Sequence, residues 1–288
     1  MLFRSIRRCV ADFVPPSDLM AWLDGRKLDA VIHMGAISDT TASDGDLVIE
    51  TNFRLSLRLL DWCTAAKVPF IYASSAATYG DGETGFEDDW SPDALKKLKP
   101  LNLYGWSKHL FDRRVARLLA QDAPRPAQHV GLKFFNVYGP NEYHKEGQRS
   151  VAHQLYPTAK AGKPARLFKS HNKKYKDGGQ LRDFIWVGDC VSVMLWLLDH
   201  PNVNGLFNLG TGQARSFADL ARALYAAVGR KPKLTYVPTP VAIRDKYQYF
   251  TEAKMDRLRA AGYSLAMTSL EDGMKQYAAL LGADDPYL

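Results

Sequence analysis

Short apolar runs alternate with longer segments of helical periodicity over the first two thirds of the chain. The runs are rich in β-branched and aromatic residues, as in buried strands, whereas the intervening segments repeat apolar positions every three or four residues. Because strands that alternate with helices form βαβ units, this order predicts an α/β fold built on a parallel sheet. Strands are predicted over Ala30–Met34, Pro69–Ala73, His129–Phe135, Asp183–Val187 and Gly205–Gly210, and helices over Asp46–Ala66, Tyr104–Ala120, Asp189–Leu198 and Ser216–Val228. The first of these helices is expected to carry Leu47, Leu55, Leu59 and Trp62 near one face.

The last third has shorter elements and is punctuated by Pro232, Pro238 and Pro240. We therefore expect a smaller domain there, closing over the carboxyl edge of the sheet, where ligands bind in open α/β folds. No internal repeat or low-complexity tract interrupts the chain.

The N-terminal segment departs from the usual opening of a dinucleotide-binding fold. Such folds begin with a strand and a glycine-rich turn at a helix N-terminus, which receives a pyrophosphate. Here the first glycine is Gly25, and Ile6–Val14 resembles a strand that would come third in such a sheet. We therefore expect a Rossmann-like sheet that lacks its first β-α-β unit, in an N-terminally truncated chain.

Composition excludes several classes of protein. With 46% apolar and 24% charged residues, the chain is neither disordered nor fibrous, and no apolar stretch is long enough to span a membrane. The basic N-terminus lacks the apolar core of a secretory signal. Three widely spaced cysteines, Cys9, Cys63 and Cys190, favour neither a disulfide framework nor a zinc site, and indicate a reducing cytoplasm.

The formal net charge of +7 is concentrated in one segment. Lys163–Arg182 contains seven Lys and Arg residues and a single acidic one, Asp177, so the rest of the chain is almost balanced. A general nucleic-acid surface is therefore not expected. A local basic loop would suit a small polyanion such as a diphosphate, and a solvated loop with surplus lysines is the alternative.

Polar residues with a capacity for chemistry follow three of the predicted elements. Tyr104 and Lys108 lie four apart on a predicted helix and so share one face, where the ammonium favours the phenolate. The strand at 69–73 runs into the hydroxyl-rich turn Ser74–Gly80, and the strand at 129–135 into Asn136–Pro140. Hydroxyl groups often only terminate a strand or cap a helix. The Tyr104–Lys108 pair and the two polar turns are nevertheless expected at the same edge of the sheet. Together they indicate a site at which a tyrosine takes a proton from a carbinol while a nicotinamide takes the hydride.

These motifs resemble the extended short-chain dehydrogenase/reductase superfamily. Within it, further stretches resemble the nucleotide-sugar epimerases that act on ADP-heptoses in lipopolysaccharide core synthesis. The stretches are Asn136–Lys145, Ser150–Ala152, Arg182–Phe184, Phe207–Gly212 and Tyr247–Thr251. The resemblance covers the chain from about residue 10 to its end, and implies a nucleotide-binding domain (1–134, 186–212 and 249–262) and a substrate domain (135–185, 213–248 and 263–288).

The resemblance also implies roles for individual residues. Tyr104 and Lys145 would be the two acid/base groups, with Lys108 on the nicotinamide ribose and Ser75 bonded to the reacting carbinol. The expected cofactor contacts are Met34, Gly35, Ala36, Ile37, Ser38, Asn52, Lys108, Val137 and Lys145. The expected substrate contacts are Ser75, Asn136, Phe168, Lys169, Ser170, His171, Arg182 and Tyr247. No metal is expected.

The implied reaction is an epimerisation at C6″ of ADP-D-glycero-D-manno-heptose through a 6″-keto intermediate. The resemblance implies NADP as the cofactor, with NAD as the alternative, and a homo-oligomer, a pentamer in the related enzymes. Neither a nucleic acid nor a membrane is expected as a partner, and the protein is expected in the cytoplasm.

Some residues depart from the pattern of the family, and other functions stay open. Lys133 stands where relatives often have Arg, and Gly147 and Gln154 stand where they often have Ser and His. The pair Ala76–Ala77 replaces the Asp-Glu pair of 4,6-dehydratases, which counts against dehydration. The alternatives are another nucleotide-sugar epimerase, or a truncated, non-catalytic nucleotide-binding relative.

Overall fold

A four-stranded parallel sheet forms the centre of the computed structural model, which describes residues 11–244 and 247–285. Its order is β1-β2-β3-β7, and the register pairs Phe70 with His129 and Leu132 with Phe207. The predicted α/β class with a parallel sheet is thus confirmed. The strands of this sheet are β1 (Val31–His33), β2 (Phe70–Ser75), β3 (His129–Phe134) and β7 (Gly205–Leu209).

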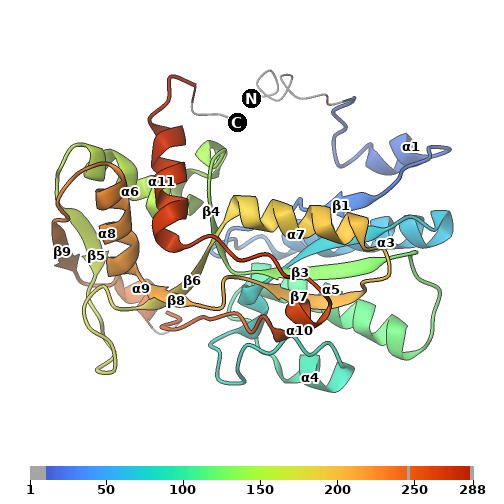
Figure 1. Ribbon diagram of the computed structural model, residues 1–288. Helices are drawn as coiled ribbons and strands as arrows, with labels where there is room; N and C mark the ends of the chain where they lie inside the picture. The colour runs from blue at the N-terminus through green and yellow to red at the C-terminus, as the bar shows by residue number, and fades with distance from the viewer. Residues whose placement is uncertain (1–10, 245–246, 286–288) are drawn as a thin grey trace.

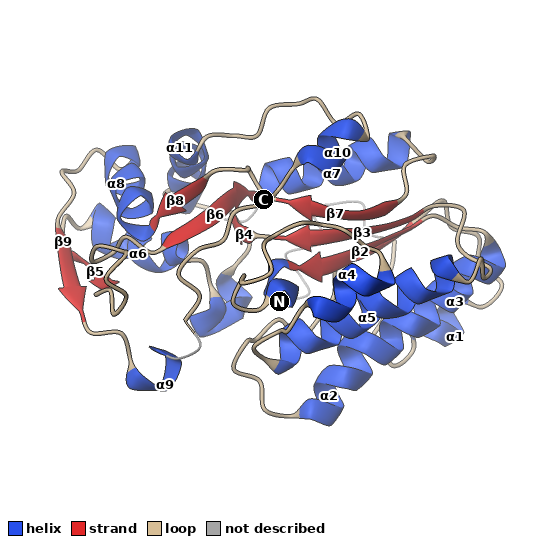
Figure 2. Cartoon of the chain, turned by 90° about the horizontal axis from the view of Figure 1, so that it is seen from below, coloured by secondary structure: helices blue, strands red, loops and turns tan. Residues whose placement is uncertain are grey.

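Helices cover both faces of the sheet. Since successive side chains of a strand point to opposite faces, each face carries apolar side chains of its own for the helices to bury. On β2, Phe70 and Tyr72 pack against α1, α3 and α5, whereas Ile71 packs in a second cluster with α7 and α10 (Figures 1 and 2). The near-continuous apolar sequence of the strands follows from burial on both faces. These helices are α1 (Leu19–Leu23), α3 (Leu55–Ala66), α5 (Leu103–Ala120), α7 (Val187–Asp199) and α10 (Asp256–Ala260), with α4 (Pro92–Lys97) beside α5.

The strand β1 lies at one end of the order of the described sheet. The strand predicted at Ala30–Met34 is present over Val31–His33, but its central residue, Ile32, is 40% exposed, so its expected burial is wrong: among the described residues β1 pairs with β2 alone. Of the strand predicted over Ile6–Val14, residues 6–10 lie outside the described part of the chain, and residues 11–14 form no strand.

The helix predicted over Asp46–Ala66 contains a change of winding. A π-helical turn, Glu50–Arg54, separates α2 (Gly45–Ile49) from α3. A π turn holds more residues than an α turn, so it rotates the preceding helix relative to the following one. Leu55 and Leu59 are buried as expected, but Leu47 is 53% exposed, and its predicted place on the apolar face is wrong.

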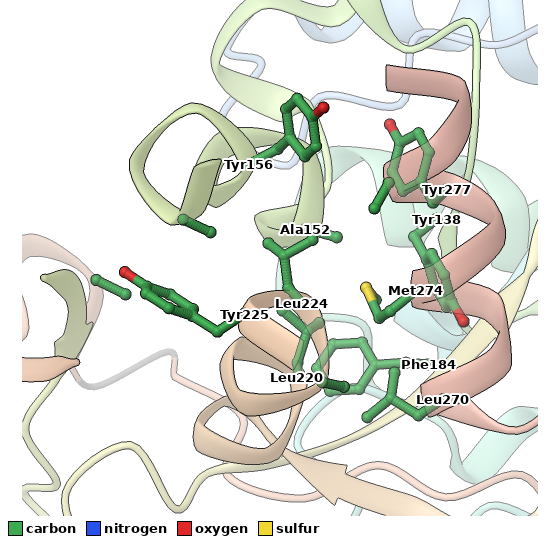
Figure 3. Close-up of a cluster of buried hydrophobic side chains, with 14 of the residues drawn as sticks. Tyr138, Ala152, Tyr156, Phe184, Leu220, Leu224, Tyr225, Leu270, Met274 and Tyr277 are labelled. Atoms are coloured by element: carbon green, nitrogen blue, oxygen red, sulfur yellow. The ribbon is translucent and has the colours of Figure 1, made fainter. Parts of the chain in front are cut away.

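A second group of elements packs around its own apolar core. Helices α6 (Val151–Lys160), α8 (Phe217–Ala227) and α11 (Leu270–Leu281) enclose Tyr138, Leu224, Met274 and Tyr277 (Figure 3). The strand β6 (Leu181–Trp186) pairs here with β4 and β8, although its sequence suggested a further strand of the βαβ series. The domain limits given above stay a prediction. The elements of this group are β4 (Asn136–Tyr138), α6 (Val151–Lys160), β5 (Ala165–Phe168), β6, β8 (Ala214–Ser216), α8 (Phe217–Ala227), β9 (Leu234–Val237), α9 (Val241–Arg244) and α11 (Leu270–Leu281).

Two kinds of feature are missing from the described residues. None of their helices combines the length and the apolar character that crossing a bilayer requires. Their His, Cys, Asp and Glu side chains form no cluster of three or more that could hold a metal ion. Cys63 and Cys190 are buried free thiols, and Cys9 lies outside the described residues.

Candidate active site

Two adjoining cavities lie at the carboxyl edge of the sheet. The larger, of about 910 Å³, is lined among others by Ser75, Tyr104, Asn136, Arg182 and Tyr247. The smaller, of about 380 Å³, shares the first three of these residues and adds Ser38, Val137 and Lys145. The carboxyl ends of parallel strands meet at one edge, so the turns after β2 and β3 converge there.

Tyr104 reaches Ser75 because α5 approaches the turn after β2 closely. Asn102 caps α5 by accepting a hydrogen bond from the Gly105 N–H (2.8 Å). A Cβ on Gly105 would lie 2.8 Å from the Ala77 carbonyl oxygen, so only glycine permits this approach. The Ser75 side chain hydrogen-bonds the Tyr104 hydroxyl. Burial raises the pKa of Tyr104, and the Ser75 hydrogen bond opposes that rise.

Ser75 also keeps the local role that hydroxyl residues usually have. Its Oγ accepts a hydrogen bond from the Ala77 N–H (3.1 Å) and so caps the 3₁₀ turn Ala76–Tyr79. The same side chain thus terminates β2 and contacts Tyr104. Capping and the expected contact with a reacting hydroxyl are compatible, because a hydroxyl oxygen has two lone pairs.

Lys108 lies one helical turn beyond Tyr104 and is 3% exposed. Burial lowers the pKa of its ammonium to about 8, and the Asp112 carboxylate opposes that shift. A cation in this position favours the phenolate form of the neighbouring tyrosine. Tyr104 and Lys108 thus lie on one face of α5, where Tyr104 lines both cavities and Lys108 is buried behind the lining.

Lys145 is an exposed residue of the 3₁₀ segment Tyr143–Gln148 and lines the smaller cavity. The segment is anchored by Glu142, which is 5% exposed. Its carboxylate accepts hydrogen bonds from the Ser150 N–H (2.5 Å), the Ser150 hydroxyl (2.7 Å) and the Tyr277 hydroxyl (2.8 Å). Glu142 therefore ties the segment that carries Lys145 to both α6 and α11.

The loop Met34–Ser38 follows β1 and is held by Asn52. Asn52 is fully buried; its amide oxygen accepts from the Ile37 N–H (2.8 Å), and its amide nitrogen donates to the Ile37 carbonyl (2.9 Å) and to Ser107 (3.0 Å). No heavy atom lies within 4 Å of the position that a Cβ of Gly35 would take. Asn52 therefore fixes the conformation of the loop, and the space next to Gly35 stays open.

Arg182 and Tyr247 line the far end of the larger cavity. The Arg182 guanidinium lies 5.4 Å from the Tyr247 ring centroid, and it donates hydrogen bonds to the Leu181 carbonyl (2.8 Å) and the Gln248 carbonyl. Phe168 contacts the Tyr247 ring edge to face, at 6.3 Å. Lys169, Ser170 and His171 continue from Phe168 but do not line either cavity. Phe168 lines neither cavity as well, and its link to Arg182 is the ring contact with Tyr247.

Several residues at the site were absent from the predictions. Thr40, Thr41 and Gln248 line the larger cavity, and the Gln248 amide donates to the Gly80 carbonyl (2.7 Å). Asp112 lies beneath the site, where it forms a buried ion pair with Lys133 (3.2 Å). Its spacing of four residues from Lys108 is a signal that could have found it, whereas nothing local distinguishes the two threonines.

Comparison with known proteins agrees with this geometry. The family model of the NAD dependent epimerase/dehydratase family matches residues 4–210. The ADP-L-glycero-D-manno-heptose-6-epimerase of Nitratidesulfovibrio vulgaris (strain DP4) is 51% identical over 263 residues, which are 91% of this chain and 79% of that protein. The enzyme of the same name from Fusobacterium nucleatum is 43% identical and covers 96% of this chain and 86% of its own.

A solved structure extends the likeness to three dimensions. The crystal structure of Helicobacter pylori ADP-L-glycero-D-manno-heptose-6-epimerase superposes with a TM-score of 0.74 at 31% identity, over 92% of this chain and 76% of that one. The resemblance drawn from the sequence motifs is therefore confirmed. The chain belongs to the NAD dependent epimerase/dehydratase family.

Proposed function

We propose that this protein is an isomerase that converts ADP-D-glycero-D-manno-heptose into its L-glycero epimer by inverting C6″. The observation that carries the proposal is that Tyr104 and Lys145, from unrelated elements, line one cavity. Inversion through a ketone needs a proton acceptor for one epimer and a proton donor for the other. The relatives described above carry this activity in their names.

Tyr104 is the proposed acid/base for one face of the sugar. With Lys108 charged beside it, its phenolate takes the proton of the C6″ hydroxyl, and Ser75 holds the same oxygen. The C6″ hydrogen leaves as a hydride and leaves a 6″-ketone. After the sugar end turns over, the hydride returns to the opposite face, and Lys145 donates the proton to the new alkoxide. The reaction has no net redox change.

The family is NAD dependent, and the residues present fit a nicotinamide dinucleotide. When bound, this group accepts and returns the hydride. The space at Gly35 is open, Val137 lines the smaller cavity, and Lys108, which shares a helix face with Tyr104, would hold the ribose. Because the Asn52 amide is already occupied by Ile37 and Ser107, its proposed contribution is to hold this loop. NADP is the proposed form.

The substrate would extend from the acid/base pair toward Arg182. Asn136 is exposed to both cavities, and Arg182 and Tyr247 offer a cation and a ring at the far end of the larger one. A diphosphate suits the guanidinium, and an adenine suits the neighbouring rings of Phe168 and Tyr247. Lys169, Ser170 and His171 are proposed to line the nucleotide end outside the cavities.

The test is a direct assay of the product. The purified chain is incubated with ADP-D-glycero-D-manno-heptose and either NADP or NAD, and the C6″ epimers are separated and quantified. Conversion to the L-glycero epimer supports the proposal. Epimerisation of UDP-glucose in place of the heptose would assign a different nucleotide sugar, and bound cofactor without turnover would indicate a non-catalytic relative. Dissociation constants for the two dinucleotides decide between NADP and NAD.

A further inference from the structure

A charged pair lies completely buried beneath the candidate site. The Lys133 ammonium and the Asp112 carboxylate are 3.2 Å apart, and both side chains are 0% exposed. Lys133 comes from β3 and Asp112 from α5, so the pair joins the sheet to the helix that carries Tyr104 and Lys108. A buried ion pair is weak evidence for stability, since desolvation offsets the attraction between the charges. Its position calls for another explanation.

The pair is bonded to the strand end that holds Ser75. Asp112 accepts hydrogen bonds from the Ser74 hydroxyl (2.6 Å) and the Tyr72 hydroxyl (3.2 Å). Lys133 donates to the Thr78 hydroxyl (2.5 Å), which in turn donates to the Ser75 carbonyl (2.8 Å). Asp112 therefore holds Ser74 directly, and Lys133 holds the Ser75 carbonyl through Thr78.

The charge of the pair also acts on the two groups above it. The Asp112 carboxylate raises the pKa of Tyr104 and that of Lys108. Lys133, bonded to the same carboxylate, supplies the compensating positive charge. With both charges present, the buried pair beneath the site carries no net charge. Removal of either partner would leave a single buried charge, which the protein interior screens only weakly.

We infer that Asp112 and Lys133 are positioning residues for the candidate acid/base, Tyr104. Together they fix the end of β2 that carries Ser75, and their opposite charges cancel beneath Tyr104 and Lys108. The inference rests on the proposed function for the role of Tyr104. It adds two residues that never touch the substrate but determine the pH at which Tyr104 works.

The other ionisable groups near Tyr104 and Lys108 complete the electrostatic setting. Burial lowers the pKa of His33 and His109 to about 4, so both stay neutral in the working range. The groups that face the pair are Tyr72 from β2, Tyr79 from the turn after it, His109 from α5 and Asp88 from the loop before α4, and His33 from β1 lies near Lys108. The ionisable side chains that line the cavities include Glu142, Lys145, Arg149, Arg182 and Tyr247.

The test compares charge variants of opposite sign by their pH profiles of kcat/KM. Lys133→Met leaves the Asp112 carboxylate without its cation, so the acid limb of the kcat/KM profile moves to higher pH by about one unit. At neutral pH, kcat/KM then falls by about tenfold or more. Asp112→Asn combined with Lys133→Arg leaves a fixed positive charge, so the limb moves to lower pH. Lys133→Arg alone restores the original position, and so does Asp112→Asn with Lys133→Met.

Controls separate this role from a merely structural one. Lys275→Met breaks an exposed ion pair with Asp272 and leaves the profile unchanged. If Lys133→Met does not fold, as judged by circular dichroism, the comparison of Lys133→Arg with Asp112→Asn/Lys133→Arg still gives the direction. Lower activity in the variants with no displacement, or displacement in one common direction, overturns the inference. Tyr104→Phe with full turnover would instead overturn the proposed function.

Discussion

The two candidate proton-transfer groups, Tyr104 and Lys145, have contrasting surroundings. Tyr104 lies half-buried on an 18-residue helix, above buried charges and beside a strand end. Lys145 lies exposed on a six-residue 3₁₀ segment, whose anchor is the buried Glu142. The first group is governed by electrostatics within a rigid framework, whereas the second depends on how firmly its segment is held. Substitutions on the two sides should therefore fail in different ways.

The largest effect is expected from Tyr104→Phe. The change removes only the hydroxyl that carries the proton, so turnover should fall by about 10²- to 10⁴-fold while the fold is kept. Epimerisation is measured with saturating substrate, and far-UV circular dichroism checks the structure. Near-normal turnover would remove Tyr104 from the chemistry.

Lys145→Met should cause a loss of the same order, about 10²-fold or more, because the second face of the ketone loses its proton donor. Lys173→Met and Lys174→Met are the matched controls, since both lysines are also exposed, and they should change turnover less than about twofold because solvent and salt screen their charges. Equal, modest losses in all three variants would reduce Lys145 to a general electrostatic contact.

Glu142→Gln should cost about tenfold in turnover without touching the substrate. The amide keeps one acceptor oxygen, but it weakens charge-assisted hydrogen bonds from Ser150 and Tyr277, each worth about 1.5–3 kcal/mol. Urea denaturation should show a loss of about 2 kcal/mol. Tyr277→Phe, which removes one donor, should give a smaller loss of both quantities. Unchanged turnover in a destabilised Glu142→Gln protein would show that the anchor serves stability alone.

The smallest effect, a few-fold, concerns the alkaline limb of kcat/KM. The pKa of Lys108 is lowered to about 8, so its charge is present below that pH and lost above it. Because the charged form favours the Tyr104 phenolate, kcat/KM should decline as the pH rises through about 8. Lys108→Arg keeps the charge and should remove this decline, even if the ribose contact is weakened. A decline that persists in the Lys108→Arg protein would assign it to another group.

Much of the candidate site could be predicted from local sequence. Tyr104 and Lys108 share a helix face because they are four residues apart, and Ser75 follows a strand of obvious apolar character. The joint position of Lys145 with them came from the resemblance, and the shared cavity agrees with it. Glu142 and Gln248 were missed because their contacts with Tyr277 and Gly80 join residues distant in sequence. Asp112 was missed although it lies four residues from Lys108, since its ion pair with Lys133 is not visible in the sequence.

The sequence alone determined the α/β class, the approximate positions of the strands of the main sheet and the helix face that Tyr104 shares with Lys108, since these depend on periodicity and on residues within one or two helical turns. Tertiary structure decided the rest. Only the packing of α5 on β3 joins Asp112 to Lys133, and only the π-helical turn at Glu50–Arg54 moves Leu47 into solvent. The sheet that β6 joins likewise depended on pairing with β4 and β8. Such outcomes depend on long-range contacts and burial, which no local pattern of apolar and polar residues encodes.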